Sequence, residues 1–354
     1  MRILITGGAG FVGSSLALMF KQDRPEATVI AFDNLRRRGS ELTLARLQRA
    51  GVTFVHGDVR QPADLDSVGP FDCLVECSAE PSVQAGYGQS PDYVLQTNLV
   101  GTIHCLEAAR RHRARVLFLS TSRVYPIAAL RALPLTEAAT RLEMSAGAAG
   151  PGWSAQGISA DFPLEGSRSI YGATKLCSEH LAEEYAALYD LPVVVNRCGV
   201  LAGPWQMGKV DQGFVSLWCA RHLFGGPLAY IGFGGQGRQV RDVLHVADLY
   251  DLVCRQIDAM RPGRYSLHTV GGGPENALSL CELTALAQAR GRAVEIGSRP
   301  ETHPADIPWY VTDISAVSAA TGWRPRRSIA TLVDEVFEWL RHNEEMLRPV
   351  LLGG

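Results

Sequence analysis

Residues 2–13 read RILITGGAGFVG, an apolar run followed at once by the glycines Gly7, Gly10 and Gly13. The run Arg2–Thr6 predicts a buried β-strand, and the segment Ser14–Lys21 predicts a helix. The first glycine permits a tight turn, the second lets backbone N–H groups approach a ligand, and the third lets the helix pack on the strand. A strand, a glycine turn of this spacing and a helix N-terminus together predict a site for the pyrophosphate of a dinucleotide.

An acidic residue supports this prediction. A second strand, Thr28–Phe32, is followed by Asp33, which lies 20 residues after Gly13, where a carboxylate accepts hydrogen bonds from the adenosine ribose. Asp33 would repel a 2′-phosphate, whereas Arg36, Arg37 and Arg38 would attract one. We predict NAD as the cofactor. The three arginines are either a solvated loop face or lie near the adenosine or a substrate diphosphate.

Further apolar runs predict the fold class. Strands are predicted at Thr53–His56, Cys73–Glu76, Val116–Ser120 and Pro192–Arg197, with helical patterns between them. Strands without in-out alternation, separated by helix-length segments, require a parallel sheet covered on both faces. We therefore predict a doubly wound α/β domain over residues 1–196 and a smaller α/β substrate domain over residues 197–354.

A long segment interrupts the first predicted domain. Residues 126–168 are rich in Ala, Gly, Pro and Ser and show no strong periodicity. Loops of this length are usually disordered or functional, so we predict an insertion that acts as a flap beside the substrate.

Composition limits the class of partner. The 354 residues carry a formal charge of −2, which gives no general attraction for nucleic acid or anionic lipid, so we expect a small-molecule partner. The eight cysteines show neither a Cys-x-x-Cys pair nor metal-ligand spacing, so we expect reduced thiols and no metal. Glycines interrupt the first apolar run, and none of the apolar stretches approaches the roughly 18 residues that a membrane span needs. We expect a cytoplasmic protein.

A second motif carries chemistry. Tyr171-x-x-x-Lys175 places a phenol and an ammonium one helical turn apart, so both project from the same face. A nearby positive charge favours the phenolate and lets a tyrosine act as a base near neutral pH. Thr121 lies at the carboxyl end of a predicted strand, where ligands of such sheets bind. We predict that Thr121, Tyr171 and Lys175 form a catalytic triad.

Several segments resemble the extended short-chain dehydrogenase/reductase family, the nucleotide-sugar epimerases and dehydratases. They are Gly7–Gly13, Asp33, Thr121, Tyr171-x-x-x-Lys175 and Arg241-Asp242-x-x-His245-x-x-Asp248. The resemblance covers nearly the whole chain and implies a Rossmann-type fold, NAD, a nucleotide-diphosphate sugar as substrate, and a homodimer or homotetramer. It also implies that Thr121 positions the reacting hydroxyl, that Tyr171 acts as base and acid, and that Lys175 holds the cofactor ribose.

Within the family the sequence is similar to the CDP-paratose and CDP-tyvelose 2-epimerases. The similar segments are Phe32–Leu35, Thr121 with Tyr125, Asp211-Gln212-Gly213 and Gln239–His245. The resemblance implies hydride removal from a sugar carbon, rotation of the keto-sugar, and hydride return to the opposite face. A UDP-sugar 4-epimerase, a net oxidoreductase and a catalytically silent dinucleotide-binding relative remain alternatives.

The residues after Thr121 discriminate among the relatives. The 4,6-dehydratases carry an Asp-Glu pair there, and this chain has Ser122 and Arg123. Family decarboxylases have a glutamate and 3,5-epimerases a cysteine in place of Arg123, whereas the 2-epimerases have a basic residue. The comparison disfavours dehydration and favours oxidation and reduction at a single carbon, C2.

Other residues are assigned to the substrate. Arg241 is similar to the family arginine that clamps the diphosphate, although a salt bridge to Asp242 or Asp248 is the alternative. Asp306 is similar to the acid that meets the nucleotide ribose, but His303 replaces a usual arginine. A histidine loses its charge near neutral pH, so we expect substrate affinity to weaken as the pH rises from about 6 to about 8.

Asp58 and Glu80 each have more than one interpretation, and Asn98 has a supporting role. Asp58 either meets the adenine amino group or caps a helix. Glu80 either accepts from a sugar hydroxyl, or pairs with Arg123, or is a carboxylate at a helix start. Asn98 is similar to a family asparagine that supports the active-site helix and the cofactor pocket.

These arguments give two sets of candidate residues. The cofactor set is Gly7, Gly10, Phe11, Val12, Gly13, Asp33, Asn34, Asp58, Val59, Cys77, Ala79, Asn98, Ser120, Tyr171 and Lys175. The substrate set is Glu80, Ser122, Arg123, Val200, Gln212, Gly213, Arg241, His303 and Asp306. Val200 stands where many epimerases have an asparagine.

Overall fold

A computed structural model describes residues 1–208 and 212–352 of the chain. It forms two compact units. Unit 1 comprises Met1–Val124, Ser169–Arg197 and Leu249–His268, and unit 2 comprises Tyr125–Arg168, Cys198–Asp248 and Thr269–Gly354.

A seven-stranded sheet forms the centre of unit 1, in the order β14-β10-β5-β4-β1-β2-β3. The pairs β5–β4, β4–β1, β1–β2 and β2–β3 are parallel. The strands span Arg2–Thr6 (β1), Thr28–Asp33 (β2), Thr53–His56 (β3), Cys73–Glu76 (β4), Arg115–Thr121 (β5), Val193–Cys198 (β10) and Tyr265–Val270 (β14). The six strands predicted from the sequence are confirmed, and β14 was not predicted.

The strand order places the ligand site. β1 lies between β4 and β2, so the connections turn in opposite directions on its two sides. In a doubly wound sheet such a switch point opens a crevice at the carboxyl ends of the strands. The glycine turn follows β1 and Asp33 ends β2, so both lie at this edge.

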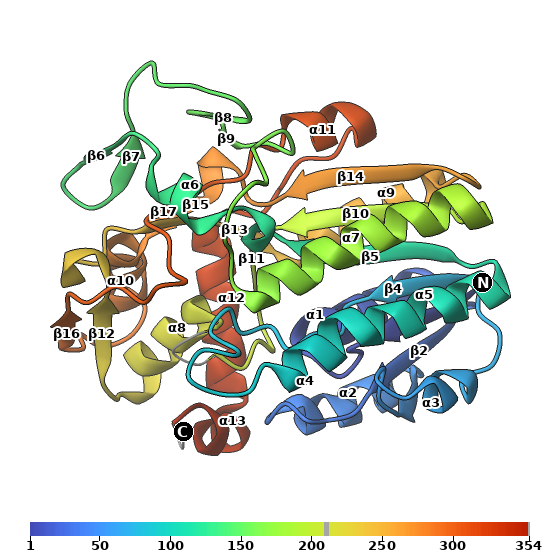
Figure 1. Cartoon of the computed structure of the whole chain (residues 1–354). Helices are drawn as coiled ribbons and strands as arrows, with labels where there is room; N and C mark the ends of the chain where they lie inside the picture. Colours follow the sequence, from blue (N-terminus) through green and yellow to red (C-terminus); the bar gives the residue numbers. More distant parts are fainter. Residues whose placement is uncertain (209–211, 353–354) are drawn as a thin grey trace. The chain divides into compact units, whose positions relative to one another are not determined.

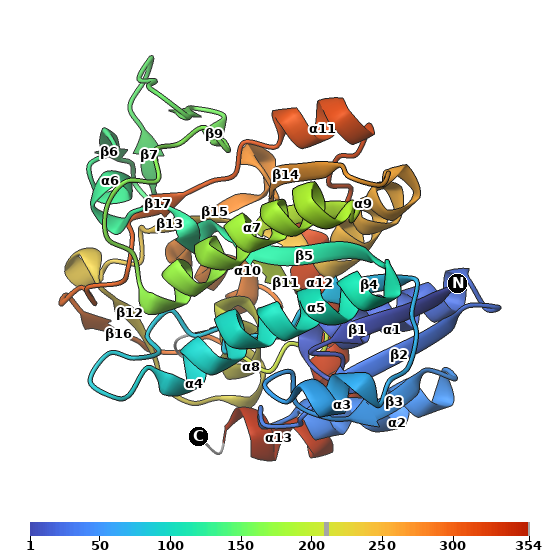
Figure 2. The ribbon, with the colours of Figure 1, turned by 45° about the vertical axis from the view of Figure 1, so that its right-hand side comes forward.

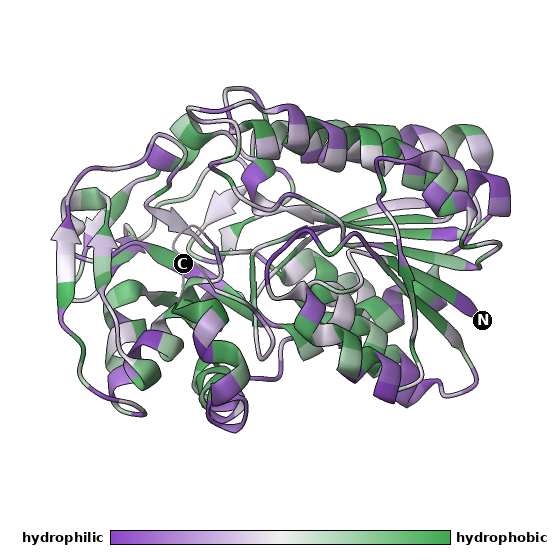
Figure 3. Cartoon of the chain, turned by 90° about the horizontal axis from the view of Figure 1, so that it is seen from below, coloured by the Kyte–Doolittle hydropathy of each residue, from purple (hydrophilic) through white to green (hydrophobic). Residues whose placement is uncertain are grey.

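Helices cover both faces of this sheet, as the doubly wound prediction requires (Figure 1). α5 and α7 run side by side along one face, as the turned view also shows (Figure 2). The helical elements of unit 1 are α1 (Phe11–Asp23), η1 (Ser40–Thr43), α2 (Leu44–Arg49), α3 (Pro62–Asp66), α4 (Asp92–Leu95), the π-helical η2 (Gln96–Val100), α5 (Gly101–His112), η3 (Ser122–Val124) and α7 (Ile170–Tyr189). The strands between them are mostly hydrophobic (Figure 3), because both faces are buried.

Unit 2 contains smaller sheets. Strands β11, β13 and β15 pair in that order, with β17 also on β13, and β12 pairs with β16. These strands span Val200–Ala202 (β11), Leu228–Ile231 (β12), Val240–His245 (β13), Ala277–Ser279 (β15), Ile296–Arg299 (β16) and Trp309–Tyr310 (β17). Its helical elements are α6 (Ile127–Arg131), α8 (Phe214–Phe224), η4 (Phe233–Gly235), η5 (Pro274–Asn276), α10 (Leu280–Gln288), α11 (Ser315–Thr321), α12 (Ile329–His342) and α13 (Glu344–Leu351).

The predicted insertion is ordered and belongs to unit 2. After α6 it forms two hairpins, β6–β7 (Leu135–Glu137, Leu142–Met144) and β8–β9 (Trp153–Ser154, Gly157–Ile158). The backbone N–H of Ile158 donates to the carbonyl of Val311 (2.8 Å), and that of Leu142 donates to the carbonyl of Arg238 (2.9 Å). A role as a substrate flap stays a prediction.

Besides the insertion, a second segment differs from the predicted division of the chain at residue 197. α9 (Val246–Ala259) carries the chain back into unit 1, and β14 then adds an edge strand beside β10. Tyr250 packs edge-on against Phe20 at 5.0 Å between ring centroids, and its hydroxyl donates to the carbonyl of Met19 (3.2 Å). This packing of a late segment on α1 is a long-range contact that local patterns do not indicate.

None of the helices in residues 1–208 and 212–352 combines the length and the apolar character that crossing a membrane requires. Among the same residues, His, Cys, Asp and Glu side chains form no group of three suited to a metal ion.

Candidate active site

The glycine turn has the geometry expected of a phosphate cradle. Gly7 has φ +62°, and a Cβ there would lie 2.8 Å from the carbonyl oxygen of Cys77. A Cβ on Gly13 would lie 2.2 Å from the carbonyl oxygen of Gly7, so α1 packs against the turn only because residue 13 is glycine. At Gly10 a Cβ would meet only the Gly7 carbonyl, at 3.1 Å, which leaves its other side open to a ligand.

The N-terminus of α1 adds to this cradle. Gly10 is the N-cap residue, no side chain caps the helix, and its first turn carries no acidic residue. The backbone N–H groups at Phe11 and Val12 are therefore available to a ligand, and the helix dipole favours a negative charge there. The residues present fit the pyrophosphate of a dinucleotide.

Asp33 is built into the same edge. Its Oδ2 accepts from the N–H of Ala9 (3.0 Å) and its Oδ1 from the N–H of Leu35 (2.8 Å). Burial raises the pKa of Asp33, and these backbone hydrogen bonds oppose the rise. The carboxylate thus joins the glycine turn to the end of β2, where the sequence places the ribose partner.

Asp58 is held by neighbouring polar groups. It accepts from Asn34 Nδ2 (2.9 Å) and from the guanidinium of Arg60 (2.7 Å). Burial favours a higher pKa, but the hydrogen bonds from Arg60 and Asn34 outweigh it and lower the pKa to about 2. The helix-cap interpretation is wrong, because the N-cap residue of α3 is Gln61. The adenine contact stays a prediction.

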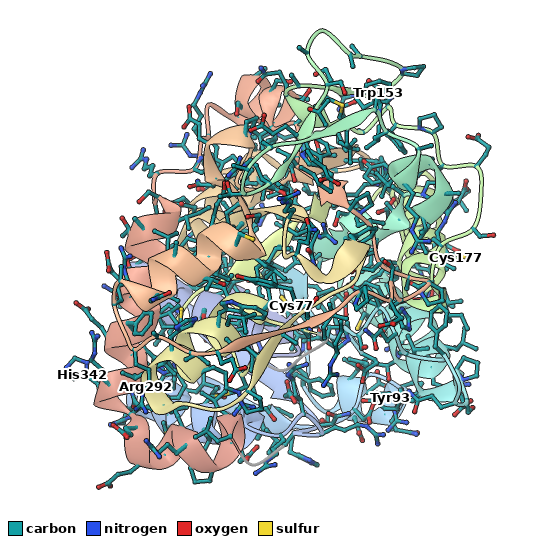
Figure 4. The ribbon with its side chains drawn as sticks, turned by 90° about the vertical axis from the view of Figure 1, so that its left-hand side faces the viewer. Cys77, Tyr93, Trp153, Cys177, Arg292 and His342 are labelled. Atoms are coloured by element: carbon teal, nitrogen blue, oxygen red, sulfur yellow. The ribbon has the colours of Figure 1, made fainter. Side chains whose placement is uncertain are left out.

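Arg36, the first of the three arginines after Asp33, stacks on an aromatic ring. The guanidinium carbon of Arg36 lies 3.9 Å from the ring centroid of Tyr93, and that of Arg60 lies 4.9 Å from the same ring. Tyr93 belongs to α4 (Figure 4). Arg36 is thus exposed and stacked on an aromatic ring, and a role near the adenosine or a substrate diphosphate stays a prediction.

The loop after β4 is fixed by Asn98. Its side chain accepts from the N–H of Glu80 (2.8 Å) and donates to the Glu80 carbonyl (3.1 Å). Its backbone carbonyl accepts from the hydroxyl of Ser178 on α7 (3.2 Å). Asn98 therefore links this loop to the helix that carries Tyr171 and Lys175, and its role in the cofactor pocket stays a prediction.

Glu80 does not start a helix, so that interpretation is wrong. The next helix along the chain is α4, which begins at Asp92. Glu80 Oε1 instead accepts from the N–H of Ser82 (3.2 Å) and closes a turn. Cys77 and Ala79 precede it and are half-buried, while Val59 is buried and its carbonyl lies 2.8 Å from Nδ1 of His104.

α7 presents the predicted catalytic pair. Ser169 caps the helix by accepting from the N–H of Gly172 (3.2 Å), which places Tyr171 in its first turn. Tyr171 is 9% exposed and Lys175 is 2% exposed. Lys175 Nζ donates to the carbonyl of Leu119 on β5 (3.1 Å) and lies 4.5 Å from the ring centroid of Phe118. The ammonium is therefore held against β5, one helical turn from the phenol.

Thr121 ends β5, and the chain continues into η3 with Ser122 and Arg123. All three lie in unit 1, and Thr121 and Ser122 are buried. Thr121 Oγ1 accepts from the N–H of Arg123 (3.2 Å), so its own hydroxyl proton stays available to a ligand. The Ser120 hydroxyl instead donates to Glu179 on α7.

Three buried charges near this pair were missed by sequence reasoning. Glu179 forms an ion pair with Arg197 (2.7 Å), and both side chains are 5% exposed or less. Glu76 Oε2 lies 3.7 Å from Lys175 Nζ. Charged residues inside otherwise apolar strands, Glu76 in β4 and Arg197 in β10, are the signal that was available.

In unit 2, Arg241 and Asp306 are brought together. Arg241 donates to Asp306 Oδ1 (2.9 Å) and to the carbonyl of Ile307 (2.6 Å), and the two side chains are 13% and 30% exposed. The alternative salt bridges considered for Arg241 involved Asp242 or Asp248. The observed carboxylate partner is instead Asp306, another residue of the predicted substrate set.

The rest of the Arg241-Asp242-x-x-His245-x-x-Asp248 motif holds unit 2 together. Buried Asp248 accepts from the backbone N–H groups of Arg326 (3.1 Å) and Arg327 (3.0 Å) and from the Arg327 guanidinium (2.6 Å). His245 Nε2 lies 3.0 Å from Glu335 Oε2 on α12. Burial lowers the pKa of His245 against the pull of the Glu335 carboxylate.

The remaining substrate candidates also lie in unit 2. His303 Nδ1 accepts from the N–H of Ala305 (3.1 Å), a bond that requires an unprotonated Nδ1. Half-buried Val200 starts β11, and Gly213 is the N-cap residue of α8 with φ +72°. Gln212 directly precedes it. Asp211, which belongs to the segment similar to the 2-epimerases, lies outside the described residues.

Comparison with known proteins identifies the relatives of the chain. The sequence profile of the NAD dependent epimerase/dehydratase family matches residues 3–267. CDP-paratose 2-epimerase of Salmonella typhi is 29% identical over 348 residues, which cover 96% of this chain and 99% of that protein. dTDP-glucose 4,6-dehydratase of Mycobacterium tuberculosis is 29% identical over 358 residues, covering 99% and 96%.

Solved structures share the fold. The crystal structure of Thermus thermophilus UDP-glucose 4-epimerase in complex with NAD superposes with a TM-score of 0.75 at 24% identity, covering 96% of this chain and 99% of that one. At this identity the likeness shows the fold, and the reaction has to be argued from the residues themselves.

Proposed function

The chain belongs to the NAD dependent epimerase/dehydratase family, and from this premise we propose that it is a nucleotide-sugar epimerase that inverts one carbon of a CDP-sugar, C2. The observation that carries the proposal is the pair on α7. Tyr171 and Lys175 lie one turn apart, both buried, with the ammonium held on the last residues of the strand that ends in Thr121.

The chemistry assigned to these residues is proton transfer coupled to hydride transfer. NAD, when bound, supplies the hydride acceptor. Thr121 holds the reacting hydroxyl through its free donor, and Tyr171 removes the hydroxyl proton and returns it later. The buried ammonium of Lys175 favours the phenolate form of Tyr171 and holds the cofactor ribose.

The residues after Thr121 support epimerisation over dehydration. Elimination of water needs an acid and a base beside the sugar in addition to the tyrosine, and the positions that resemble that pair in the dehydratases are Ser122 and Arg123. A serine hydroxyl and a guanidinium do not exchange a proton readily near neutral pH. The residues retained support oxidation and re-reduction at a single carbon.

Unit 2 supplies the proposed substrate contacts. A guanidinium fork suits a diphosphate, so we assign Arg241 to that group and Asp306 to the nucleotide ribose. In the structure these two side chains pair with each other, and a diphosphate would compete with Asp306 for Arg241. The similarity to CDP-paratose 2-epimerase over nearly the full chain supports a CDP-sugar.

The test is incubation of the purified protein and NAD with CDP-, UDP-, GDP- and dTDP-hexoses in deuterated water, followed by NMR of the sugar. We expect inversion at C2 of a CDP-sugar without deuterium incorporation, because the hydride returns to the carbon that it left. Formation of a 4-keto-6-deoxy sugar would overturn the proposal in favour of a dehydratase. Inversion at C4 would make the enzyme a 4-epimerase, and release of NADH a net oxidoreductase.

A further inference from the structure

Glu76 is a carboxylate in the interior of unit 1. It is the last residue of β4 and is 1% exposed. In the parallel sheet it pairs in register with Thr6 of β1 on one side and with Phe118 of β5 on the other. Phe118 is the residue whose ring contacts Lys175 Nζ, so Glu76 and Phe118 face the same helix, α7.

The two oxygens of Glu76 have different surroundings. Oε1 accepts from the hydroxyl of Ser78. Oε2 has no hydrogen-bond partner among the described residues and lies 3.7 Å from Nζ of Lys175. A buried carboxylate oxygen without a hydrogen bond is costly, and the adjacent ammonium is the group that offsets this cost.

The neighbouring buried pair is satisfied separately. Glu179 accepts from the Arg197 guanidinium through both oxygens (3.2 and 2.7 Å) and from the Ser120 hydroxyl. Its charge is therefore balanced by Arg197. Lys175 lies on the same face of α7, one turn before Glu179, and its charge is balanced by Glu76 on β4.

We propose that Glu76 is a positioning residue for Lys175, whose carboxylate holds and balances the buried ammonium and thereby sets the pH at which Tyr171 accepts a proton. This inference rests on the roles assigned to Tyr171 and Lys175 in the proposed function. An ammonium favours the phenolate beside it, and an adjacent carboxylate cancels part of that effect. Glu76 therefore keeps Tyr171 protonated to a higher pH than Lys175 alone would.

The Cys105 thiol on α5 is a further titratable group that interacts electrostatically with both Glu76 and Lys175. Burial raises the pKa of the Cys105 thiol on α5 well above its usual range, so it stays neutral. η2 carries no titratable side chain, and Asp92 of α4 is exposed. Glu179 and Arg197 form their own pair, and Arg123 on η3 adds a positive charge that the variants below leave unchanged.

The experiment measures the phenol directly. Phenolate absorbance of the NAD-loaded protein is titrated against pH, and the titration of Tyr171→Phe is subtracted so that the signal of Tyr171 remains. In Glu76→Gln we expect the midpoint to fall by about one pH unit, the size of a single-charge effect at short range in a protein interior. Glu76→Asp keeps the charge and is expected to return most of the shift.

Ser78→Ala is the matched control, because it removes the other contact of Glu76 and leaves both charges in place. Its midpoint is expected within about 0.2 units of the parent protein. A Glu76→Gln midpoint that equals the parent value in a folded protein overturns the proposal.

A second variant tests the proposal if Glu76→Gln does not fold. The double variant Glu76→Gln/Lys175→Met removes both charges of the pair, and we expect it to fold where the single variant fails. Failure of the double variant as well would overturn the counter-ion role. These readouts need no nucleotide sugar, so an absence of epimerisation breaks the proposed function and leaves this inference testable.

Discussion

Two motifs of this chain, Tyr171-x-x-x-Lys175 in unit 1 and Arg241-Asp242-x-x-His245-x-x-Asp248 in unit 2, use their polar side chains differently. In the first, the Lys175 ammonium donates to a carbonyl of β5, and Glu76 lies beside it as a buried carboxylate. In the second, Asp248 binds the segment before α12 and His245 binds α12 itself. Arg241 is the member of that motif that pairs with another predicted substrate residue, Asp306.

The difference shows that the residues of one motif can have either a chemical or a structural role. Membership of a motif does not say whether a side chain performs chemistry or builds the fold, whereas burial and partners do. A buried carboxylate that accepts from several backbone N–H groups replaces the capping bonds of a loop, and its loss is felt as instability. The loss of a buried cation at the edge of the sheet where the ligand binds is expected to lower the rate of catalysis. The following predictions separate the two effects.

The largest expected effect is on Tyr171→Phe. We expect turnover to fall by about 10³-fold, because the base is removed, and bound NAD per protein to change by much less, because Tyr171 is one of many residues in the predicted cofactor set. Turnover by NMR and cofactor content by absorbance measure this. Tyr185→Phe, on the same helix, is the control, because the Tyr185 hydroxyl donates to Glu107 (2.6 Å) away from the motif. An equal loss of turnover in both variants would contradict the assignment.

The second effect is on stability. Asp248→Ala leaves three donors of Arg326 and Arg327 without an acceptor, so we expect the free energy of unfolding to fall by about 3 kcal/mol. Urea unfolding measures the loss. The control is Asp334→Ala, which breaks an ion pair to Arg290 whose aspartate is 56% exposed, and a change below about 1 kcal/mol is expected there. Similar losses in the two variants would argue against a structural role particular to Asp248.

The third prediction uses pH. Burial raises the pKa of Asp242 from 3.8 to about 6, against the hydrogen bond from the N–H of Gly273. A folded-state pKa above the unfolded one stabilises the protein below the unfolded value, and this contribution is lost as the pH rises from about 4 through about 6. The loss corresponds to roughly 3 kcal/mol.

Asp242→Asn does not titrate, so the difference in unfolding free energy between the parent protein and this variant isolates the effect. We expect the parent protein to lose stability relative to the variant between about pH 4 and about pH 6 and the difference to level off above that range. A difference that does not vary with pH contradicts the prediction. Contributions of His245 cancel in this comparison.

The smallest expected effect is on Arg241→Lys. The lysine keeps the charge but loses the fork that binds two phosphate oxygens, so we expect KM for the nucleotide sugar to rise by about tenfold with kcat nearly unchanged. Steady-state kinetics measure both constants. A fall in kcat with constant KM would place Arg241 in the chemistry instead of in substrate binding.

Most of the central sheet was predictable because its signals are local. The bounds of β1, β3 and β4 agree with the apolar runs Arg2–Thr6, Thr53–His56 and Cys73–Glu76. β14 was missed because its residues follow a segment of unit 2 in the sequence, and no local pattern indicates that the chain returns to pair with β10. Half-buried side chains over Tyr265–His268 also weaken the apolar signal of that strand.

The candidate site was predictable where spacing sets geometry. The backbone fixes the arrangement of glycines three residues apart in a turn and of a tyrosine four residues before a lysine in a helix. The turn has a defined conformation, and the helix has a constant number of residues per turn. The acidic residues Asp58 and Glu80 were not, because the choice between a helix cap and a turn depends on where the next helix begins.

The amino-acid sequence determined the glycine turn after β1, the spacing of the predicted catalytic pair and the Ser122-Arg123 sequence after Thr121, because all of these depend on residues close together in the chain. Only the tertiary structure decided which charges meet in the interior. Glu76 and Lys175 are 99 positions apart in the sequence and come within 3.7 Å because β4, β5 and α7 pack in layers. Arg241 and Asp306 likewise meet through the folding of unit 2, since an ion pair between distant residues depends on packing and not on local pattern.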